Sequence, residues 1–386
     1  MFFCVALGLV GGVHYYLWAR LVRDAGLAPW LHRTLTGALI GLFLSIPVTI
    51  LLVRLTEAEW ARPLAWVAFG WMGMLFILLI VVGPLDALRG LWLAIAHWSA
   101  PPDPERRQLI SRTLASAAGL LASGVGVAAL RSGLGPVAVR EVEVALRRLP
   151  GELDRLTIVQ LTDIHVGPTI RREFIEEIVA KTNALRPDLI AITGDLVDGS
   201  VEELAEHVAP LGKLHARYGV YFVTGNHEYY SGADEWCRKL SELGIRVLRN
   251  ERVSIGLGDM SFDLAGVDDF HSARFGGDNG PDLSRALRGR DANRELVLLA
   301  HQPAAIHEAA KLGVGLQLSG HTHGGQIWPW NFLVRLQQPV VSGLSYFGST
   351  TIYVSNGTGY WGPPMRLGAP AEITHITLRA PTEAIV

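Results

Sequence analysis

Five short polar motifs in the second half of the 386-residue chain contain the side chains best suited to chemistry. They are Asp163-Ile164-His165, Gly194-Asp195-Leu196-Val197-Asp198, Gly225-Asn226-His227-Glu228, Ala300-His301-Gln302 and Gly320-His321-Thr322-His323-Gly324. Two motifs pair polar residues two positions apart, and residues at i and i+2 of an extended chain point to one side. Each pair can therefore serve one binding site, and the flanking glycines let the backbone approach a bound group closely.

An apolar run precedes each motif, and an amphipathic segment follows most of them. The clearest runs cover residues 156–161, 189–193, 220–224 and 296–300. Near-continuous apolar strands bounded by helices are typical of a sheet covered on both faces, where ligands bind beyond the carboxyl ends of the strands. We therefore predict an α/β domain over residues 151–386, with a linker and first strand over 131–150, in which the five motifs converge.

The first third of the chain has a different composition. Residues 1–100 contain six Arg, four acidic residues and no Lys, which is too few charges for an ordinary soluble surface. A helix needs about 20 apolar residues to cross the hydrocarbon of a bilayer. The charge-poor runs therefore predict a transmembrane region over residues 1–130, with helices at 1–22, 34–55, 63–85 and 110–130.

We expect the third helix to break at Gly83-Pro84, because an unbroken helix as far as Trp98 would be about 54 Å long. Segment 86–100 is then predicted to lie along the membrane interface. Arginine counts of seven and six on the two sides hardly favour one orientation under the positive-inside rule. Arg106-Arg107 and the apolar residues after it are similar to a twin-arginine export signal, although a cytoplasmic loop can also contain such a pair. We expect a multi-pass protein of the cell membrane whose second half is exported.

The charge and the cysteines exclude several classes of function. The net charge is −2 and there is no long basic run, so nucleic-acid binding has no electrostatic support. Cys4 and Cys237 lie far apart in the sequence, which indicates neither a disulfide nor a thiolate metal site. The predicted spans contain almost no ionisable residues, which argues against a transporter or sensor.

In their order along the chain, the motifs resemble those of the calcineurin-like metallophosphoesterase superfamily: D-x-H, G-D-x-x-D, G-N-H-[DE], H and G-H-x-H. The match is complete and covers residues 155–378. The segments 266–269, 320–326 and 356–359 look like those of a bacterial membrane-associated branch. The resemblance implies a four-layer αββα sandwich of the α/β class and a hydrolase that acts on phosphoesters.

The resemblance also implies a role for each polar residue of the motifs. Two divalent ions would be bound by seven side chains, with Asp195 as the bridge, Asp163, His165 and His323 in one site, and Asn226, His301 and His321 in the other. Nitrogen and oxygen ligands without thiolate favour Mn, Fe or Zn. Ions about 3.5–4 Å apart can share a hydroxide that attacks the phosphorus. His227 is expected to protonate the departing oxygen, with Asp198 as its orienting partner.

Two stretches between the motifs are expected to shape the substrate pocket, namely 270–283 and 327–333. In the second, Trp328, Trp330 and Phe332 are expected to contact lipid or the bilayer interface, although packing beneath the domain is an alternative. Gly199 stands where Ser/Thr protein phosphatases have Arg, which disfavours that activity. The expected partners are the membrane and a phosphoester that is lipid-linked or derived from the cell envelope.

Two alternatives stay open at this point. One is a metal-dependent binding or scaffold domain without catalysis, but such domains should lose ligands or the catalytic histidine, and here the set is complete. The other is a cytoplasm-facing hydrolase of a nucleotide-linked lipid precursor such as UDP-2,3-diacylglucosamine.

Overall fold

The computed structural model describes residues 2–55, 59–96, 103–276 and 280–381. The chain divides into two compact units. The first comprises Met1–Leu134 and Gly362–Met365, and the second comprises Gly135–Trp361 and Arg366–Val386.

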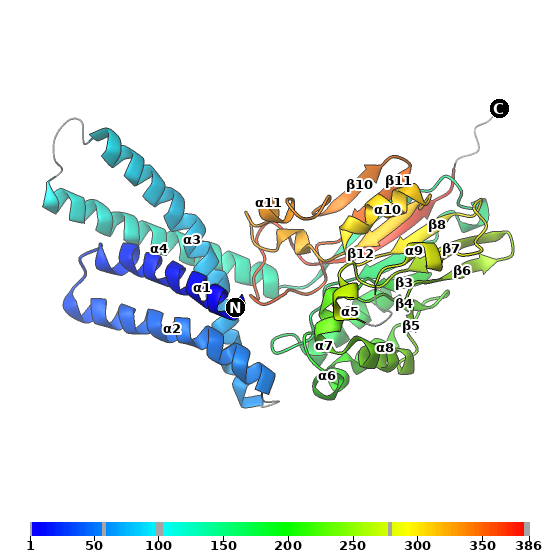
Figure 1. Cartoon of the computed structure of the whole chain (residues 1–386), viewed down its shortest axis with the longest axis horizontal. Coiled ribbons are helices and arrows are strands. Elements are labelled where there is room, and N and C mark those ends of the chain that lie inside the picture. Colours follow the sequence, from blue (N-terminus) through cyan, green and yellow to red (C-terminus); the bar gives the residue numbers. More distant parts are fainter. Residues whose placement is uncertain (1, 56–58, 97–102, 277–279, 382–386) are drawn as a thin grey trace. The chain divides into compact units, whose positions relative to one another are not determined.

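Four long helices make up the first unit (Figure 1). They are α1 (Phe2–Trp18), which continues into a π-helical turn at Ala19–Arg23, α2 (Pro29–Leu55), α3 (Arg62–Ala96) and α4 (Pro104–Leu134). Each contains a window that is long and apolar enough to cross a membrane, and only 17–39% of the residues in these windows are buried inside the protein. Apolar side chains that face outward in this way are expected of helices solvated by lipid.

The predicted break at Gly83-Pro84 is wrong, because α3 continues without interruption from Arg62 to Ala96 with Pro84 inside it. Proline removes one backbone donor, and helices that cross a membrane tolerate it because neighbouring helices, side chains or local adjustment of the helix can satisfy the carbonyl that loses its partner. Residues 86–96 are therefore part of α3 and do not form a separate interfacial element. Trp98 and the rest of segment 97–100 lie outside the described residues.

His14 links two helices of this unit. It is buried, and its Nε2 accepts a hydrogen bond from Nε1 of Trp71 at 2.8 Å. Its Nδ1 lies 2.8 Å from the carbonyl oxygen of Val10 and therefore donates to it. Both ring nitrogens have partners, so His14 is a hydrogen-bonded core residue of this unit.

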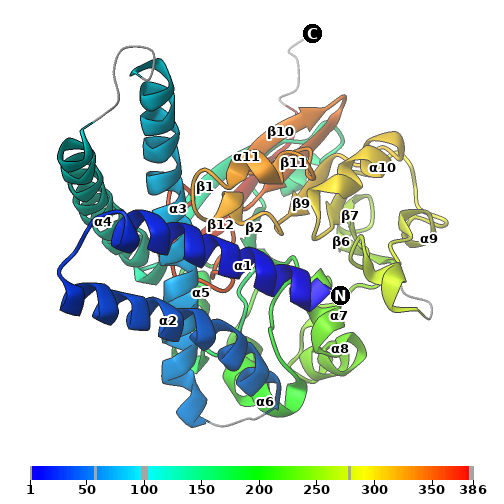
Figure 2. The same ribbon diagram turned by 60° about the vertical axis from the view of Figure 1, so that its left-hand side comes forward.

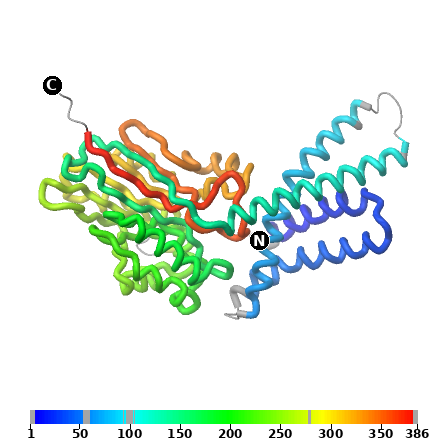
Figure 3. Tube along the Cα trace, turned by 180° about the vertical axis from the view of Figure 1, so that it is seen from behind, coloured from blue at the N-terminus to red at the C-terminus, as the bar shows by residue number. Residues whose placement is uncertain are grey.

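Two six-stranded mixed sheets form the centre of the second unit. The strand order is β1-β12-β2-β3-β4-β5 in the first sheet and β10-β11-β9-β8-β7-β6 in the second. The strands of the first sheet are β1 (Ala138–Ala145), β2 (Thr157–Leu161), β3 (Leu189–Ile192), β4 (Val220–Phe222), β5 (Arg246–Val247) and β12 (Glu372–Arg379). Those of the second are β6 (Glu251–Leu257), β7 (Met260–Gly266), β8 (Leu296–Leu299), β9 (Leu316–Ser319), β10 (Gly343–Phe347) and β11 (Thr350–Val354). In Figure 3 the last strand, β12, runs beside β1, with which it pairs in parallel.

The buried apolar residues of this unit form three clusters, one between the sheets and one on the outer face of each, so helices cover both outer faces. Alternate residues of one strand point to opposite faces: Val159 packs against α5 (Arg172–Ala184), α6 (Val201–Val208) and α8 (Ala233–Glu242), whereas Ile158 packs between the sheets. On the far side, Leu298 packs against α9 (Leu283–Ala286) and α10 (Ile306–Lys311). Figure 2 shows these two helices beside the second sheet. The predicted four-layer αββα sandwich is confirmed.

Candidate metal centre

The two sheets bring all five motifs to one edge of the sandwich. Asp163 and His165 follow β2, Asp195 follows β3, and Asn226 opens the short helix α7 (Asn226–Ser231) after β4. The second sheet supplies His301 after β8, and His321 and His323 after β9. These strands are mostly apolar and largely buried, and their carboxyl ends place the polar side chains of the motifs at one edge of the sheets.

Carboxylate and imidazole groups at this edge lie close enough to share metal ions. Three sets have ligand atoms within 4.8 Å of one another: Asp163 with His165 and His323, His165 with Asp195 and His227, and Asp195 with His301 and His321. Asp195 belongs to two of them. Its Oδ2 lies 3.1 Å from Nε2 of His301 and 3.9 Å from Nε2 of His165. Asp195 is therefore positioned to join two clusters.

Asn226 provides an independent test of whether these residues fit a metal. Its side-chain oxygen is buried, and no hydrogen-bond partner contacts it among the residues that the structure describes. An unpaired buried carbonyl oxygen is costly, so such groups in native proteins need a specific reason. A divalent cation beside the His301 and His321 imidazoles would supply the missing partner, and the residues therefore fit the group.

The backbone is also strained at this edge. Nine non-glycine residues in the described part of the chain have positive φ, and five of them are among the seven predicted ligands. These five have φ between 50° and 70°: Asp163, His165, Asp195, His321 and His323. Strained residues persist where the surrounding structure over-determines them, and they cluster at functional sites.

Two glycines in the motifs are required because carboxylates lie against them. A Cβ on Gly225 would collide with Oδ1 of Asp195, and a Cβ on Gly320 would collide with Oδ2 of Asp163. Without a Cβ at these positions, the backbone after β4 can lie against the Asp195 carboxylate, and the backbone after β9 can lie against the Asp163 carboxylate. In the second case the N–H of His321 then donates to both oxygens of Asp163, at 2.9 Å each.

Charge is unevenly distributed over the imidazoles when metal is absent. Burial lowers the pKa of His321 to about 3, with the neighbouring His301 acting in the same direction, and burial also lowers the pKa of His323. Burial would lower the pKa of His301 as well, but the Asp195 carboxylate outweighs it and raises that pKa well above its ordinary value. At neutral pH, His321 and His323 are ready to bind a cation, whereas His301 must first lose a proton.

This proton predicts a pH dependence of metal binding. We expect Mn²⁺ to displace a proton from His301, so the affinity of the chelator-treated chain should rise with pH by up to about tenfold per unit for each proton released. Calorimetric titrations at about pH 6 and about pH 8 would measure the affinity, and buffers of different ionisation enthalpy would count the protons. A His301→Ala variant should release fewer protons. Binding without proton release in any buffer would contradict this assignment.

Asp198 contacts two imidazoles rather than one. Its Oδ1 accepts hydrogen bonds from Nδ1 of His227 at 2.6 Å and from Nδ1 of His165 at 3.0 Å. Burial would raise the pKa of Asp198, but the two imidazoles hold it well below its usual range. Burial alone would likewise lower the pKa of His227, but Asp195 and Asp198 raise it to about 9. Sequence reasoning had linked Asp198 only to His227, and the contact with His165 is new.

Glu228 holds the backbone of two motifs together, a role that sequence reasoning did not assign. Its carboxylate is fully buried and accepts three backbone N–H groups, from Asp195 at 3.0 Å, Leu196 at 2.8 Å and Gly225 at 2.6 Å. These bonds fix the turn that carries Asp195. The only sequence signal was the acidic residue that ends the Gly225 to Glu228 motif.

Glu228→Gln is expected to lower the free energy of unfolding by about 2 kcal/mol, since an amide nitrogen would face a backbone N–H and leave a buried donor unsatisfied. Urea titration in detergent, followed by tryptophan fluorescence, would measure the change. The matched control is Glu235→Gln on α8, where the side chain is exposed and the effect should stay within about 0.5 kcal/mol. Equal stability of the two variants would contradict the role of Glu228.

The predicted substrate-contacting aromatics are exposed. Trp328, Trp330 and Phe332 lie in and beside the short helix α11 (Asn331–Val334), where each is about half exposed. Trp328 also lines a cavity of about 510 Å³ together with Gly324, the residue after the last histidine of the motifs. Nδ1 of His271 lies 3.2 Å from the Nε2 of Gln302, the residue after His301.

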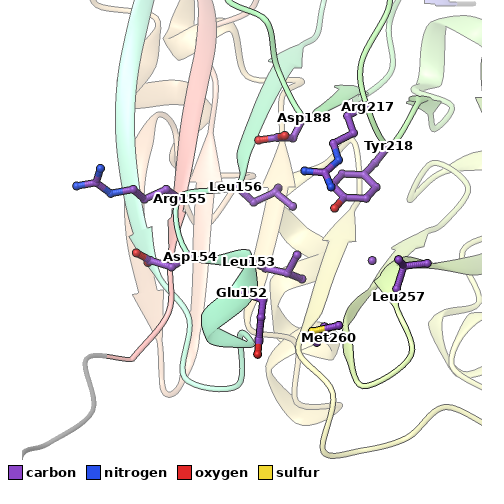
Figure 4. A pocket seen from close by; sticks show the side chains of 11 residues that line it. Glu152, Leu153, Asp154, Arg155, Leu156, Asp188, Arg217, Tyr218, Leu257 and Met260 are labelled. Carbon is purple, nitrogen blue, oxygen red and sulfur yellow. The ribbon is translucent and has the colours of Figure 1, made fainter.

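A second pocket lies at the other end of the strands (Figure 4). Leu156, Asp188 and Tyr218 stand just before β2, β3 and β4, and they line a cavity of about 240 Å³. The Asp188 carboxylate accepts hydrogen bonds from the backbone and hydroxyl of Thr157, so it is already engaged. Among the described residues, the sets able to hold a metal all lie at the opposite, carboxyl edge.

Comparison with known proteins agrees with this geometry. A family model described as calcineurin-like phosphoesterase matches residues 156–325. A transmembrane protein with metallophosphoesterase domain from Bos taurus is 37% identical, covering 98% of this chain and 88% of that protein, and its counterpart from Danio rerio is 34% identical, covering 98% and 89%. An uncharacterized metallophosphoesterase of Helicobacter pylori is 40% identical, covering 65% of this chain and 66% of that protein.

Two of these relatives are animal proteins, so the branch that the sequence resembles is not confined to bacteria. The similarity to the two animal proteins extends over the helical unit as well as the catalytic one, since it covers 98% of this chain. The chain belongs to the calcineurin-like phosphoesterases, a family of metal-dependent enzymes that hydrolyse phosphoesters.

Proposed function

We propose that this chain is a membrane-anchored phosphoesterase with a dinuclear metal centre. One ion would be held by Asp163, His165 and His323, the other by Asn226, His301 and His321, with Asp195 between them. The observation that carries the proposal is the position of Asp195 Oδ2, which lies within 4 Å of imidazoles from both sets. Mn, Fe or Zn suits this mixture of nitrogen and oxygen donors.

When bound, two such ions supply charge that stabilises phosphoryl oxygens and water acidified enough to act as a nucleophile near neutral pH. The protein's own contribution is to move a proton. Nδ1 of His227 donates to Asp198, which leaves Nε2 free to protonate the departing oxygen. The same carboxylate also orients His165, so Asp198 fixes the orientation of a proposed metal ligand and of the proposed acid, His227.

A direct test is hydrolysis of bis(p-nitrophenyl) phosphate and of p-nitrophenyl phosphate by the full chain in detergent, with Mn²⁺, Fe²⁺ or Zn²⁺ added after chelation. We expect metal-dependent release of p-nitrophenol, and the ratio between the two substrates would separate diesterase from monoesterase activity. If no metal supports turnover of either compound, the alternative of a non-catalytic metal-dependent domain is preferred.

The exposed Trp328, Trp330 and Phe332 support a substrate that is lipid-linked or derived from the cell envelope. Amphipathic rings are favoured at the boundary between lipid and water, and a group of exposed rings close to the last histidine motif indicates a binding surface. Replacing all three by Ala should reduce hydrolysis of a lipid-linked phosphoester and spare a soluble one. An equal effect on both substrates would remove the lipid contact from the proposal.

We also propose that four helices anchor the chain as a multi-pass protein of the cell membrane, with the catalytic unit exported. The four apolar helices and the transmembrane relatives support anchoring, and Arg106-Arg107 supports export. Protease added to intact cells should then digest the second unit. Protection of that unit until the cells are lysed would instead favour a cytoplasm-facing hydrolase of a nucleotide-linked lipid precursor.

A further inference from the structure

Two exposed aromatic rings contact His227, and a third packs against one of them. The rings of Tyr230 and Trp361 lie edge-on to its imidazole, with centroids 5.4 and 5.5 Å away. Phe275 lies 5.5 Å from Tyr230 and extends the group. Tyr230 is 66% exposed, Trp361 56% and Phe275 45%, so all three rings also present apolar surface outward. We call these three residues the aromatic wall.

The aromatic wall comes from three separate segments. Tyr230 belongs to α7, Phe275 ends the 3₁₀ turn Ser272–Phe275, and Trp361 follows the 356–359 motif. Apolar side chains gathered from distant segments around one catalytic group form a binding surface, whereas isolated exposed rings need no explanation.

Gln326, the last residue of the 320–326 motif, holds Trp361 in place. Its Nε2 donates to the carbonyl oxygen of Trp361, and its Oε1 accepts from the N–H of Trp361, both at 3.0 Å. This pair of hydrogen bonds resembles the pairing of two residues in adjacent strands, and it fixes the backbone of Trp361. Gln326 also donates its own N–H to the carbonyl oxygen of His323, so the segment that carries a predicted metal ligand also positions the wall.

The same segment continues into the exposed rings of α11. Ile327 forms a backbone bridge to Leu367, and Trp328, Trp330 and Phe332 follow directly. Exposed apolar rings therefore occur both beside His227 and in the segment proposed above to contact lipid. Two groups of exposed rings joined by one short segment favour an extended apolar group over a compact ring, and the chain has four helices able to cross a membrane.

We propose that the aromatic wall binds the alkyl chain of a lipid-type leaving group, with Trp361 as the main contact and Gln326 as its positioning residue. The inference rests on the proposed function, because it takes His227 as the acid beside the departing oxygen. The apolar group of the substrate then lies on the leaving alcohol, the side of the phosphoester next to His227.

Binding of phosphonates tests the wall without turnover. Methylphosphonate, hexylphosphonate and phenylphosphonate share the same oxygens and differ only in the group beyond phosphorus. Calorimetry on the Mn²⁺-loaded full chain should give a Kd for hexylphosphonate about tenfold below that for methylphosphonate, since several methylene groups leave water. Trp361→Ala should abolish this preference, Trp361→Phe should keep most of it, and Gln326→Ala should lose part of it. Methylphosphonate should bind all three variants as it binds the wild type, which also shows that they are folded.

The matched control is Tyr346→Ala, which removes an even more exposed ring from β10 and should leave the ratio of the two Kd values unchanged. Partition of hexylphosphonate into detergent is common to all variants and cancels in the comparison. Equal affinity for methyl and hexyl compounds, or a preference unaffected by Trp361→Ala, would overturn the inference. A gain for phenylphosphonate as large as that for hexylphosphonate would overturn the alkyl chain as occupant. Failure of every phosphonate to bind, together with absent hydrolysis, would count against the proposed function itself.

Discussion

Asp195→Asn is expected to lower kcat/KM for phosphodiester hydrolysis by at least about a thousandfold, the scale of the several kcal/mol that metal charge supplies to a transition state. The substitution keeps the shape of the side chain and removes the negative charge shared by both ligand sets. Its Oδ2 lies 3.1 Å from Nε2 of His301 and 3.9 Å from Nε2 of His165, so both clusters lose their common ligand. Hydrolysis of bis(p-nitrophenyl) phosphate and metal content by mass spectrometry would measure the two effects.

The control for this change is Asp154→Asn, which alters the same group at the opposite end of the strands. Asp154 pairs with Arg379 at 3.2 Å and accepts the N–H of Ala380, so its loss should affect stability slightly and activity not at all. A variant Asp195→Asn that retains full metal content and at least about a tenth of wild-type kcat/KM would show that Asp195 does not bridge two ions.

The architecture of the second unit could be predicted from the sequence because its signals are local. A buried strand such as Leu189–Ile192 is apolar throughout, and the helix after it places Leu204 and Val208 on one face. Such periodic patterns are readable in a single window of sequence. The convergence of the motifs then followed from a general property of these sheets, that polar residues gather at the carboxyl ends of the strands.

The part that could not be predicted depends on contacts between distant segments. Asp198 and His165 are 33 positions apart, and nothing in either motif shows that one carboxylate orients two imidazoles. Trp361 lies with Tyr360 in a Gly-rich and Pro-rich stretch of sequence, and only the bond to Gln326 and the contact with His227 give it a role.

The error at Pro84 has a different origin. The sequence rule treated proline as a helix breaker, and the length estimate for a helix through Trp98 added to that expectation. In α3 the ladder of hydrogen bonds continues on both sides of Pro84 as far as Ala96. A local rule was outweighed by the cooperative stability of a long apolar helix, which makes ending such a helix in an apolar medium costly.

His227→Gln is expected to lower kcat by about a hundredfold to ten-thousandfold, the usual contribution of a positioned acid, while metal content stays unchanged. Its Nδ1 is bonded to Asp198 and its predicted task is to protonate the leaving oxygen, so the loss should depend on that oxygen. A diester with an alkyl alcohol leaving group needs the proton and should show the full loss, whereas p-nitrophenolate leaves without one and should show a smaller loss.

Asp198→Asn separates this role from metal binding. Because Asp198 accepts hydrogen bonds from both His165 and His227, the substitution should lower metal affinity as well as kcat, whereas His227→Gln should lower kcat alone. Turnover of both substrates and calorimetric Mn²⁺ affinity would be compared across the two variants. If His227→Gln reduces hydrolysis of the two diesters by the same factor, His227 does not protonate the leaving group. If it also weakens Mn²⁺ binding as much as Asp198→Asn does, it belongs with the ligands, since its Nε2 lies 3.9 Å from Oδ2 of Asp195.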